Sequence, residues 1–171
     1  ANGPADNDKK VLDKQILSEL QYFPLAFQNE HKETTWKAEA VICNYEDSWQ
    51  SARTFGGARK HEGTDLMTIR NERGIYPIVS MTDGTLEQMG WLKLGGWRIG
   101  IRSASGTYYY YAHLESYAPD LEDGMAVHAG QLLGFAGDSG YGTEGTTGQF
   151  DVHLHVGIYI HHNTDKEEAI N

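Results

Sequence analysis

The sequence predicts a mainly β protein, built on an antiparallel sheet or sandwich and preceded by an N-terminal helix. The chain has 171 residues and 20 glycines, and so many glycines favour tight turns and short strands over long helices. Short apolar segments separated by turn residues recur along the second half of the chain. A hydrophobic fraction of 39% suits a packed domain with its own core. We divide the chain into a linker, helix and lead-in segment, residues 1–54, and a main domain, residues 55–171.

The N-terminal helix is predicted over residues 8–22. Leu12, Ile16 and Leu20 recur at a spacing of four, which places them on one apolar face. We expect this face to pack against the main domain.

A β-hairpin is predicted around Asp83-Gly84, a dipeptide typical of the two-residue type I′ turn. Its strands would be residues 76–82 and 85–89. A second turn is expected at Ser105-Gly106. Further strands, bounded by turn residues, are predicted at residues 97–102, 107–113, 131–136 and 152–160.

Residues 138–149 form a glycine-rich loop directly before the last predicted strand. Ordering such a loop costs conformational entropy, so it more often shapes a site than merely connects two strands. A mobile surface loop is the alternative.

His153, Leu154 and His155 lie inside the last predicted strand. Because successive side chains alternate, both histidines point to one face, with their Cα atoms ~6.5–7 Å apart. This arrangement suits one histidine as a metal ligand and the other as a neighbour that acts on the reacting group. The spacing alone does not distinguish the two roles, and two solvated histidines on an exposed face are the alternative.

His61 and Asp65 form a second candidate, in the sequence His-Glu-Gly-Thr-Asp. In an extended strand their side chains would lie ~13 Å apart, too far to share a metal ion. A bend at Gly63 would fold His61 back towards Asp65, because glycine adopts backbone angles closed to other residues. The alternative is an ordinary surface turn.

Two neutral imidazoles and one carboxylate, with a fourth position for water, are the ligand pattern of a catalytic zinc ion. A structural zinc site built on thiolates is excluded, because the chain has one cysteine.

His113 ends a predicted strand and follows four consecutive tyrosines, residues 108–111. This position suits the rim of a site, and an ordinary surface histidine fits it equally well. Two of the tyrosines must face each way, so alternate tyrosines are expected in the core, and the others can line the site.

In their order along the chain, these motifs resemble those of the M23 metallopeptidases, the lysostaphin-like or LytM-type peptidoglycan endopeptidases. Residues 59–65 are similar to the family's first metal motif, His-x-Gly-x-Asp, and residues 111–114 to its Tyr-x-His-Leu element. Residues 127–137 are similar to its Val-x-x-Gly-Gln-x-Ile-Gly hairpin, and residues 153–155 to its His-x-His motif. The resemblance covers roughly residues 55–160.

The resemblance implies a role for each candidate residue. His61, Asp65 and His155 would bind one zinc ion per chain, and His113 and His153 would be the catalytic pair. It also implies a narrow groove on the sheet, walled in part by the glycine-rich loop.

The resemblance further implies hydrolysis of peptide cross-bridges in bacterial peptidoglycan, at glycyl-glycine or D-Ala-containing bonds, through a zinc-activated water. The rival interpretation is a non-catalytic relative that serves as a scaffold or binding protein of the cell envelope or sporulation machinery. A peptidoglycan peptide is the expected partner, and the chain is expected to act as a monomer.

The net charge of −10 argues against non-specific binding to nucleic acid or to an anionic membrane surface. No stretch reaches the ~18 consecutive apolar residues that would span a bilayer. Because the implied substrate lies outside the cytoplasmic membrane, we expect an extracellular or cell-envelope location. A membrane anchor, export signal or additional module would then come from a segment outside this sequence.

Overall fold

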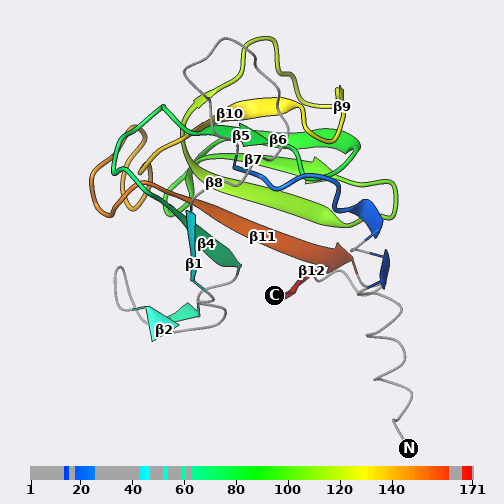
Figure 1. The fold of residues 1–171 in the computed structure, drawn as a ribbon, viewed down its shortest axis with the longest axis horizontal. Coiled ribbons are helices and arrows are strands. Elements are labelled where there is room, and N and C mark those ends of the chain that lie inside the picture. The colour runs from blue at the N-terminus through cyan, green and yellow to red at the C-terminus, as the bar shows by residue number, and fades with distance from the viewer. Residues whose placement is uncertain are drawn as a thin grey trace, which may run out of the picture.

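The structure is a computed structural model, which describes residues 14–15, 18–25, 43–46, 52–53, 59–60, 63–161 and 167–170. Within these residues the protein is mainly β, as the sequence predicts (Figure 1). Residues 14–15 and 18–19 are helical, but much of the predicted N-terminal helix lies outside the described residues and stays a prediction. In the described part of the chain, no helix has the length and apolar character needed to cross a membrane.

Antiparallel pairing organises the strands. The main sheet runs in the order β1 (Cys43–Glu46), β4 (Thr64–Thr68), β11 (His153–His161), β8 (Tyr108–Tyr117), β7 (Gly96–Arg102), β6 (Gly84–Leu92) and β9 (Ala126–Val127). Three further strands extend it: β10 (Leu132–Ala136) pairs with β8 and with β5 (Pro77–Val79), and β12 (Glu167–Ile170) pairs with β11. A separate ladder joins β2 (Ala52–Arg53) to β3 (Arg59–Lys60).

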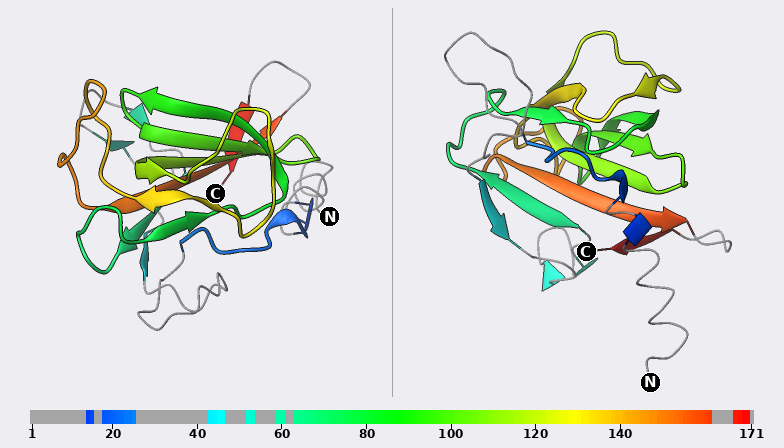
Figure 2. Two further views of the ribbon diagram at one scale, coloured as in Figure 1. Left: turned by 90° about the horizontal axis from the view of Figure 1, so that it is seen from above. Right: turned by 45° about the vertical axis from the view of Figure 1, so that its right-hand side comes forward.

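The sheet curls around its core. In Figure 1, β11 crosses the molecule, with β8, β7 and β6 on one side and β4 and β1 on the other. Seen from above in Figure 2, β10 and β5 lie across from β6 and β7. Side chains from both groups meet in one core cluster, among them Ile78, Leu86, Ile99, Ile101 and Leu133.

Alternation along the central strands separates this core from the opposite face. Tyr109, Tyr111 and Leu154 are fully buried in the core cluster, as predicted for alternate tyrosines. Burial of an aliphatic side chain such as that of Leu154 contributes ~1.5–3 kcal/mol. The residues between them point to the other side of β4, β11, β8 and β7, which we call the site face: Asp65, Arg98, Gly100, Arg102, Tyr108, Tyr110, Ala112, His155, Gly157 and Tyr159.

The predicted hairpin at Asp83-Gly84 is wrong. Strand β5 pairs with β10, while β6 pairs with β7 and β9. Asp83 instead accepts hydrogen bonds from the backbone N–H of Ala129 (2.8 Å) and the side-chain amide of Gln21 (3.2 Å). The chain bends at residues 81–82, and Gly84 already begins β6. The partner of β5 lies far along the chain, where local turn preference carries no information about pairing.

The predicted turn at Ser105-Gly106 is confirmed. Strands β7 and β8 pair across it, and Gly106 has a φ of 90°, which favours glycine. The backbone N–H of Ser103 donates to the oxygen of Thr107 at 2.9 Å and closes the turn.

Candidate active site

Strands β4 and β11 bring a carboxylate and an imidazole together. In their antiparallel register, Asp65 lies opposite His155. Nδ1 of His155 is 2.7 Å from Oδ1 of Asp65, and the two side chains are 12% and 7% exposed. Because the pair is largely shielded from water, its electrostatic attraction is stronger than that of a surface pair.

Gly63 forms the predicted bend just before β4. Its φ of 109° favours glycine, and a Cβ at this position would overlap the backbone oxygen of Val156. The same Cβ would lie 3.0 Å from Nε2 of His155, so the bend packs against the strand that carries this imidazole. His61 itself lies outside the described residues, so its approach to Asp65 stays a prediction.

His153 lies on the same side of β11 as His155, as alternation predicts. Its side chain is buried, and Nε2 is 3.7 Å from Oδ1 of Asp65. Its Nδ1 donates to the backbone oxygen of Asp151 at 2.8 Å, and its backbone N–H donates to Gly137 at 3.2 Å. These contacts fix the ring with Nε2 facing the carboxylate.

A β-bulge directs His113 into the same place. The pairing of β7 with β8 shifts register between Trp97 and Ile99, so Arg98 faces two residues, Ala112 and His113. His113 has a φ of 65°, an uncommon conformation for a residue other than glycine. Such a bulge re-aims a side chain, and here it directs the imidazole away from the core side.

The ring of His113 is packed among other rings. Its centroid lies 4.8 Å from that of His153 and 6.0 Å from that of His155. On its other sides it contacts Phe150 at 4.5 Å and Tyr141 at 6.1 Å between centroids. The aromatic contacts shield the imidazole from water.

Burial holds the pKa of His113 well below its usual range, and the neighbouring imidazoles of His153 and His155 lower it further. At neutral pH the ring is therefore neutral. Nδ1 donates to the backbone oxygen of Ser139 at 2.7 Å, because a carbonyl oxygen only accepts. Nε2 is then the nitrogen with a lone pair, able to accept a proton.

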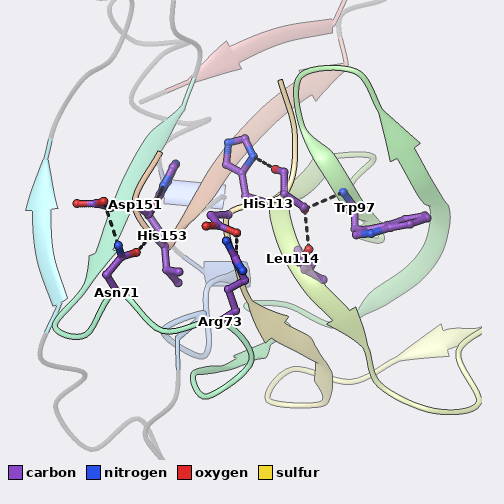
Figure 3. A network of polar contacts seen from close by, with 10 residues as sticks. Asn71, Arg73, Trp97, His113, Leu114, Asp151 and His153 are labelled. Atoms are coloured by element: carbon purple, nitrogen blue, oxygen red, sulfur yellow. Dashed lines mark hydrogen bonds and ion pairs between the residues drawn. The ribbon is translucent and has the colours of Figure 1, made fainter. Parts of the chain in front are cut away.

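The start of the glycine-rich loop holds this imidazole in place (Figure 3). The Ser139 hydroxyl donates to the backbone oxygen of Leu114 at 2.6 Å and accepts from the backbone N–H of Trp97 at 3.1 Å. Gly140 has a φ of 127°, and a Cβ there would overlap the backbone oxygen of Leu94 and lie 3.2 Å from Nδ1 of His113. The loop therefore does shape the site, through its first residues.

Two polar residues between β4 and β5, which the sequence analysis missed, secure this region from the other side (Figure 3). Arg73 donates from Nε to the buried carboxylate of Asp138 at 2.6 Å, next to Ser139. Asn71 donates to the Asp151 carboxylate at 3.2 Å and accepts from the backbone N–H of Val152 at 2.7 Å. No spacing or motif could have pointed to either residue, because their partners lie 65 to 81 positions away.

The structure thus brings Asp65, His113, His153 and His155 together and leaves His61 outside the described residues. Within the described ranges, no group of three His, Cys, Asp or Glu side chains is placed to hold a metal ion. The pair in contact, Asp65 and His155, offers a carboxylate oxygen and an imidazole nitrogen, both of which zinc takes as ligands. The donor chemistry of these two residues fits zinc.

The chain is similar in sequence to proteins of a known family. The chain matches the sequence model of peptidase family M23 over residues 59–170. It is 47% identical over 116 residues to an L-Ala--D-Glu endopeptidase of Bacillus subtilis, across 68% of this chain and 34% of that protein. It is 33% identical over 122 residues to the glycyl-glycine endopeptidase ALE-1 of Staphylococcus capitis, across 64% of this chain and 32% of that protein. The chain spans about a third of the length of these relatives.

Solved structures agree with the fold. A lytM protein from Ruminococcus gnavus, assigned as a glycyl-glycine endopeptidase, superposes with a TM-score of 0.76 at 51% identity, covering 90% of this chain and 58% of that chain. The catalytic domain of lysostaphin from Staphylococcus simulans gives a TM-score of 0.57 at 24% identity, covering 74% of this chain and 88% of that domain. At the latter identity the likeness shows the fold alone.

Proposed function

Since the chain belongs to peptidase family M23 and is therefore a LytM-type peptidase, we propose that it is a zinc-dependent endopeptidase that hydrolyses the peptides of bacterial peptidoglycan. The observation that supports this most directly is the placement of His113 and His153 beside the contact between Asp65 and His155. We assign this activity to the main domain, residues 55–171.

We propose His61, Asp65 and His155 as the ligands of one zinc ion per chain. The contact between Asp65 and His155 supports two of them, and the likeness of residues 59–65 to the family's metal motif supports His61. When bound, zinc supplies Lewis-acid chemistry, which polarises a carbonyl group and lowers the pKa of water towards ~7.

His113 is the proposed general base. Its Nδ1–H is held by Ser139, its burial keeps the ring neutral, and its Nε2 can accept the proton of the attacking water. His153 is the proposed partner that orients the reacting oxygen, because its own Nδ1–H is fixed by Asp151 while Nε2 faces the site.

We propose that the bond cleaved joins two residues with little side-chain bulk on at least one side. The relative with 47% identity is named for the L-Ala–D-Glu bond and the one with 33% identity for the glycyl-glycine bond. The first therefore leads, and glycyl-glycine or D-Ala-containing bonds are the alternatives. Because these substrates lie outside the cytoplasmic membrane, we propose that the protein acts there.

The test is a digest of purified peptidoglycans that differ in bridge chemistry, with the new amino termini identified by mass spectrometry. The zinc-loaded protein should release one kind of end, and the same protein stripped by a chelator should release none. If the loaded protein releases no new end from any peptidoglycan, the endopeptidase proposal is wrong. The rival, a non-catalytic scaffold, would then gain support from retention of the protein on the intact polymer.

A further inference from the structure

Phe150 contacts both candidate catalytic imidazoles. Its ring centroid lies 4.5 Å from that of His113 and 5.0 Å from that of His153, while the two imidazole centroids are 4.8 Å apart. The three rings therefore occupy the corners of a nearly equilateral triangle. At these separations, and with interplanar angles of 59° to 63°, the rings are in direct contact and are too close for a water molecule to lie between them.

The ring of Phe150 covers the two imidazoles on their outer side. Phe150 is half-buried, whereas His113 and His153 are buried. The residues that precede it, 147–149, are exposed. Phe150 thus lies directly after the glycine-rich loop and separates both imidazoles from the solvent on that side.

Contacts on two sides fix the position of Phe150. Next to it along the chain, Asn71 donates to the Asp151 carboxylate at 3.2 Å and accepts from the backbone N–H of Val152 at 2.7 Å (Figure 3). The ring itself meets that of Tyr141 edge to face, at 5.3 Å between centroids. Because its backbone and its ring are both held, Phe150 forms a fixed stop for its neighbours.

The two imidazoles need such a stop. Nδ1 of His113 donates to the backbone oxygen of Ser139 at 2.7 Å, and Nδ1 of His153 donates to that of Asp151 at 2.8 Å. One hydrogen bond at this end of the ring restricts rotation about the Cβ–Cγ bond but does not fix it, because this torsion of histidine has broad energy wells. The position of Nε2, at the far end of each ring, therefore depends on packing.

We propose that Phe150 is a positioning residue, which fixes the spacing and tilt of His113 and His153 so that both Nε2 atoms reach the same reacting group. This proposal rests on the endopeptidase function proposed above and adds to it a residue with no acid–base chemistry of its own. Alanine at this position would leave a gap beside both imidazoles that water can enter. Misplacing a catalytic group by about 1 Å can cost on the order of 10²-fold in rate.

The kinetic test uses the zinc-loaded protein and a soluble peptidoglycan fragment with an L-Ala–D-Glu bond. Phe150→Ala should lower kcat about 10- to 100-fold, because both imidazoles lose their stop. KM should stay within about threefold of the parent value, and the zinc content should be unchanged, since the ring contributes to the transition state and not to substrate binding. Phe150→Tyr, which keeps the ring, should retain most of the parent kcat, and Phe150→Leu, which fills part of the space, should lie between.

Phe135→Ala is the matched control. Phe135 is the same type of residue and is also half-buried, but it lies on β10, in register with Ser116 and Pro77. Its replacement should leave kcat near the parent value. Three results would overturn the proposal: a parent-like kcat in Phe150→Ala, a loss confined to KM, which would make the ring a wall of the substrate groove, or an equal loss of kcat in Phe135→Ala, which would indicate general loosening of the fold.

A second measurement follows the imidazoles directly by NMR and needs no turnover. In zinc-loaded protein with isotope-labelled histidine, the Nδ1–H protons of His113 and His153 should exchange slowly with water, because both are bonded to backbone oxygens and shielded by Phe150. Their signals are assigned by their loss in His113→Gln and His153→Gln. Phe150→Ala should speed the exchange of both protons more than about tenfold by easing local opening, and Phe135→Ala should leave it unchanged.

The exchange measurement separates failure of the positioning role from failure of the endopeptidase proposal. If the parent cleaves no peptide, faster exchange of both protons in Phe150→Ala still supports the positioning role. Exchange at the parent rate overturns that role, whatever the turnover. If Phe150→Ala does not fold, Phe150→Leu takes its place, with a smaller change expected in kcat and in exchange. Parent-like values of both in that variant would also overturn the proposal.

Discussion

At the residue scale, the candidate site depends on a backbone conformation that most residues avoid. His113 has a φ of 65° at the bulge in β8, and a non-glycine residue held in this region costs of order ~1–3 kcal/mol. The surrounding contacts, above all Ser139 and Phe150, hold it there. A regular strand would turn the imidazole towards the core, so the bulge itself is a requirement of the proposed chemistry.

Removing either catalytic imidazole should separate metal binding from turnover. We expect His113→Ala and His153→Ala to keep zinc but to lose on the order of 10²–10⁴ in kcat, the usual contribution of acid–base and charge-stabilising groups. His128→Ala is the control, because its side chain is 85% exposed and its ion-pair contact is with Asp83, outside the site. Parent-level turnover in either site variant would remove that residue from the mechanism.

Removing a proposed zinc-binding side chain should instead abolish zinc binding. His155→Ala and Asp65→Asn should lose zinc, measured by elemental analysis after dialysis, because each deletes one of the two donors in contact. His61→Ala combined with His155→Ala should bind none. Full zinc occupancy in that double variant would contradict the ligand assignment.

The sequence predicts the residues of the site better than the contacts that hold those residues in place. Alternation correctly puts His153 and His155 on one face, because it depends on adjacent residues alone. Asn71 and Arg73 could not be predicted, because their contacts form only after distant segments fold together. The left-handed conformation of His113 was likewise hidden, because a bulge depends on the register of the neighbouring strand.

At the scale of elements, strands were predictable and their partners were not. Apolar runs between turn residues mark β7, β8, β10 and β11 correctly, whereas β5 was paired with the wrong strand. Composition suggests that the glycine-rich loop carries little of the core. The structure instead divides it into a buried start, Asp138 and Ser139, and a remainder that is half-buried or exposed apart from Gly140.

Two loop replacements should therefore behave differently. A Gly-Ser linker in place of residues 142–148 should change substrate choice while the urea midpoint and zinc content stay near those of the parent. Extending the replacement to residues 138–148 should lower stability and turnover together, because it removes the Arg73–Asp138 pair and the Ser139 hydroxyl bonds. Equal stability of the two replacements would show that the buried start of the loop is not structural.

At the scale of the whole molecule, one hydroxyl ties the central strand to the segment between β5 and β6. The fully buried Tyr111 accepts a hydrogen bond from the backbone N–H of Met81 at 2.9 Å. Met81 also accepts from the backbone N–H of Gln21, so the same segment joins the N-terminal residues to the sheet. Sequence periodicity predicts that Tyr111 is buried, but not this bond.

Tyr111→Phe should destabilise the fold by ~1–3 kcal/mol, because it leaves the N–H of Met81 buried without an acceptor. Tyr109→Phe is the control: its hydroxyl donates to Glu19, which stays partly exposed and can bond to water instead. Urea unfolding of the two variants gives the comparison. A smaller loss for Tyr111→Phe than for Tyr109→Phe would contradict this account.

Residues 108–111 are all tyrosine, so the first part of β8 presents nearly the same side chains on both faces of the sheet. If the strand slipped by one residue against its neighbours, Tyr108 and Tyr110 would exchange places with Tyr109 and Tyr111 at little hydrophobic cost. The native register has one steric requirement on this face: the ring of Tyr108 lies where any side chain at position 100 would be, so it needs a glycine there, diagonally across from it and paired with Tyr110. The packing of Tyr108 in the native register thus depends on the absence of a methyl group at position 100. Misfolded forms with an inverted β8 are accordingly the expected product of filling that position.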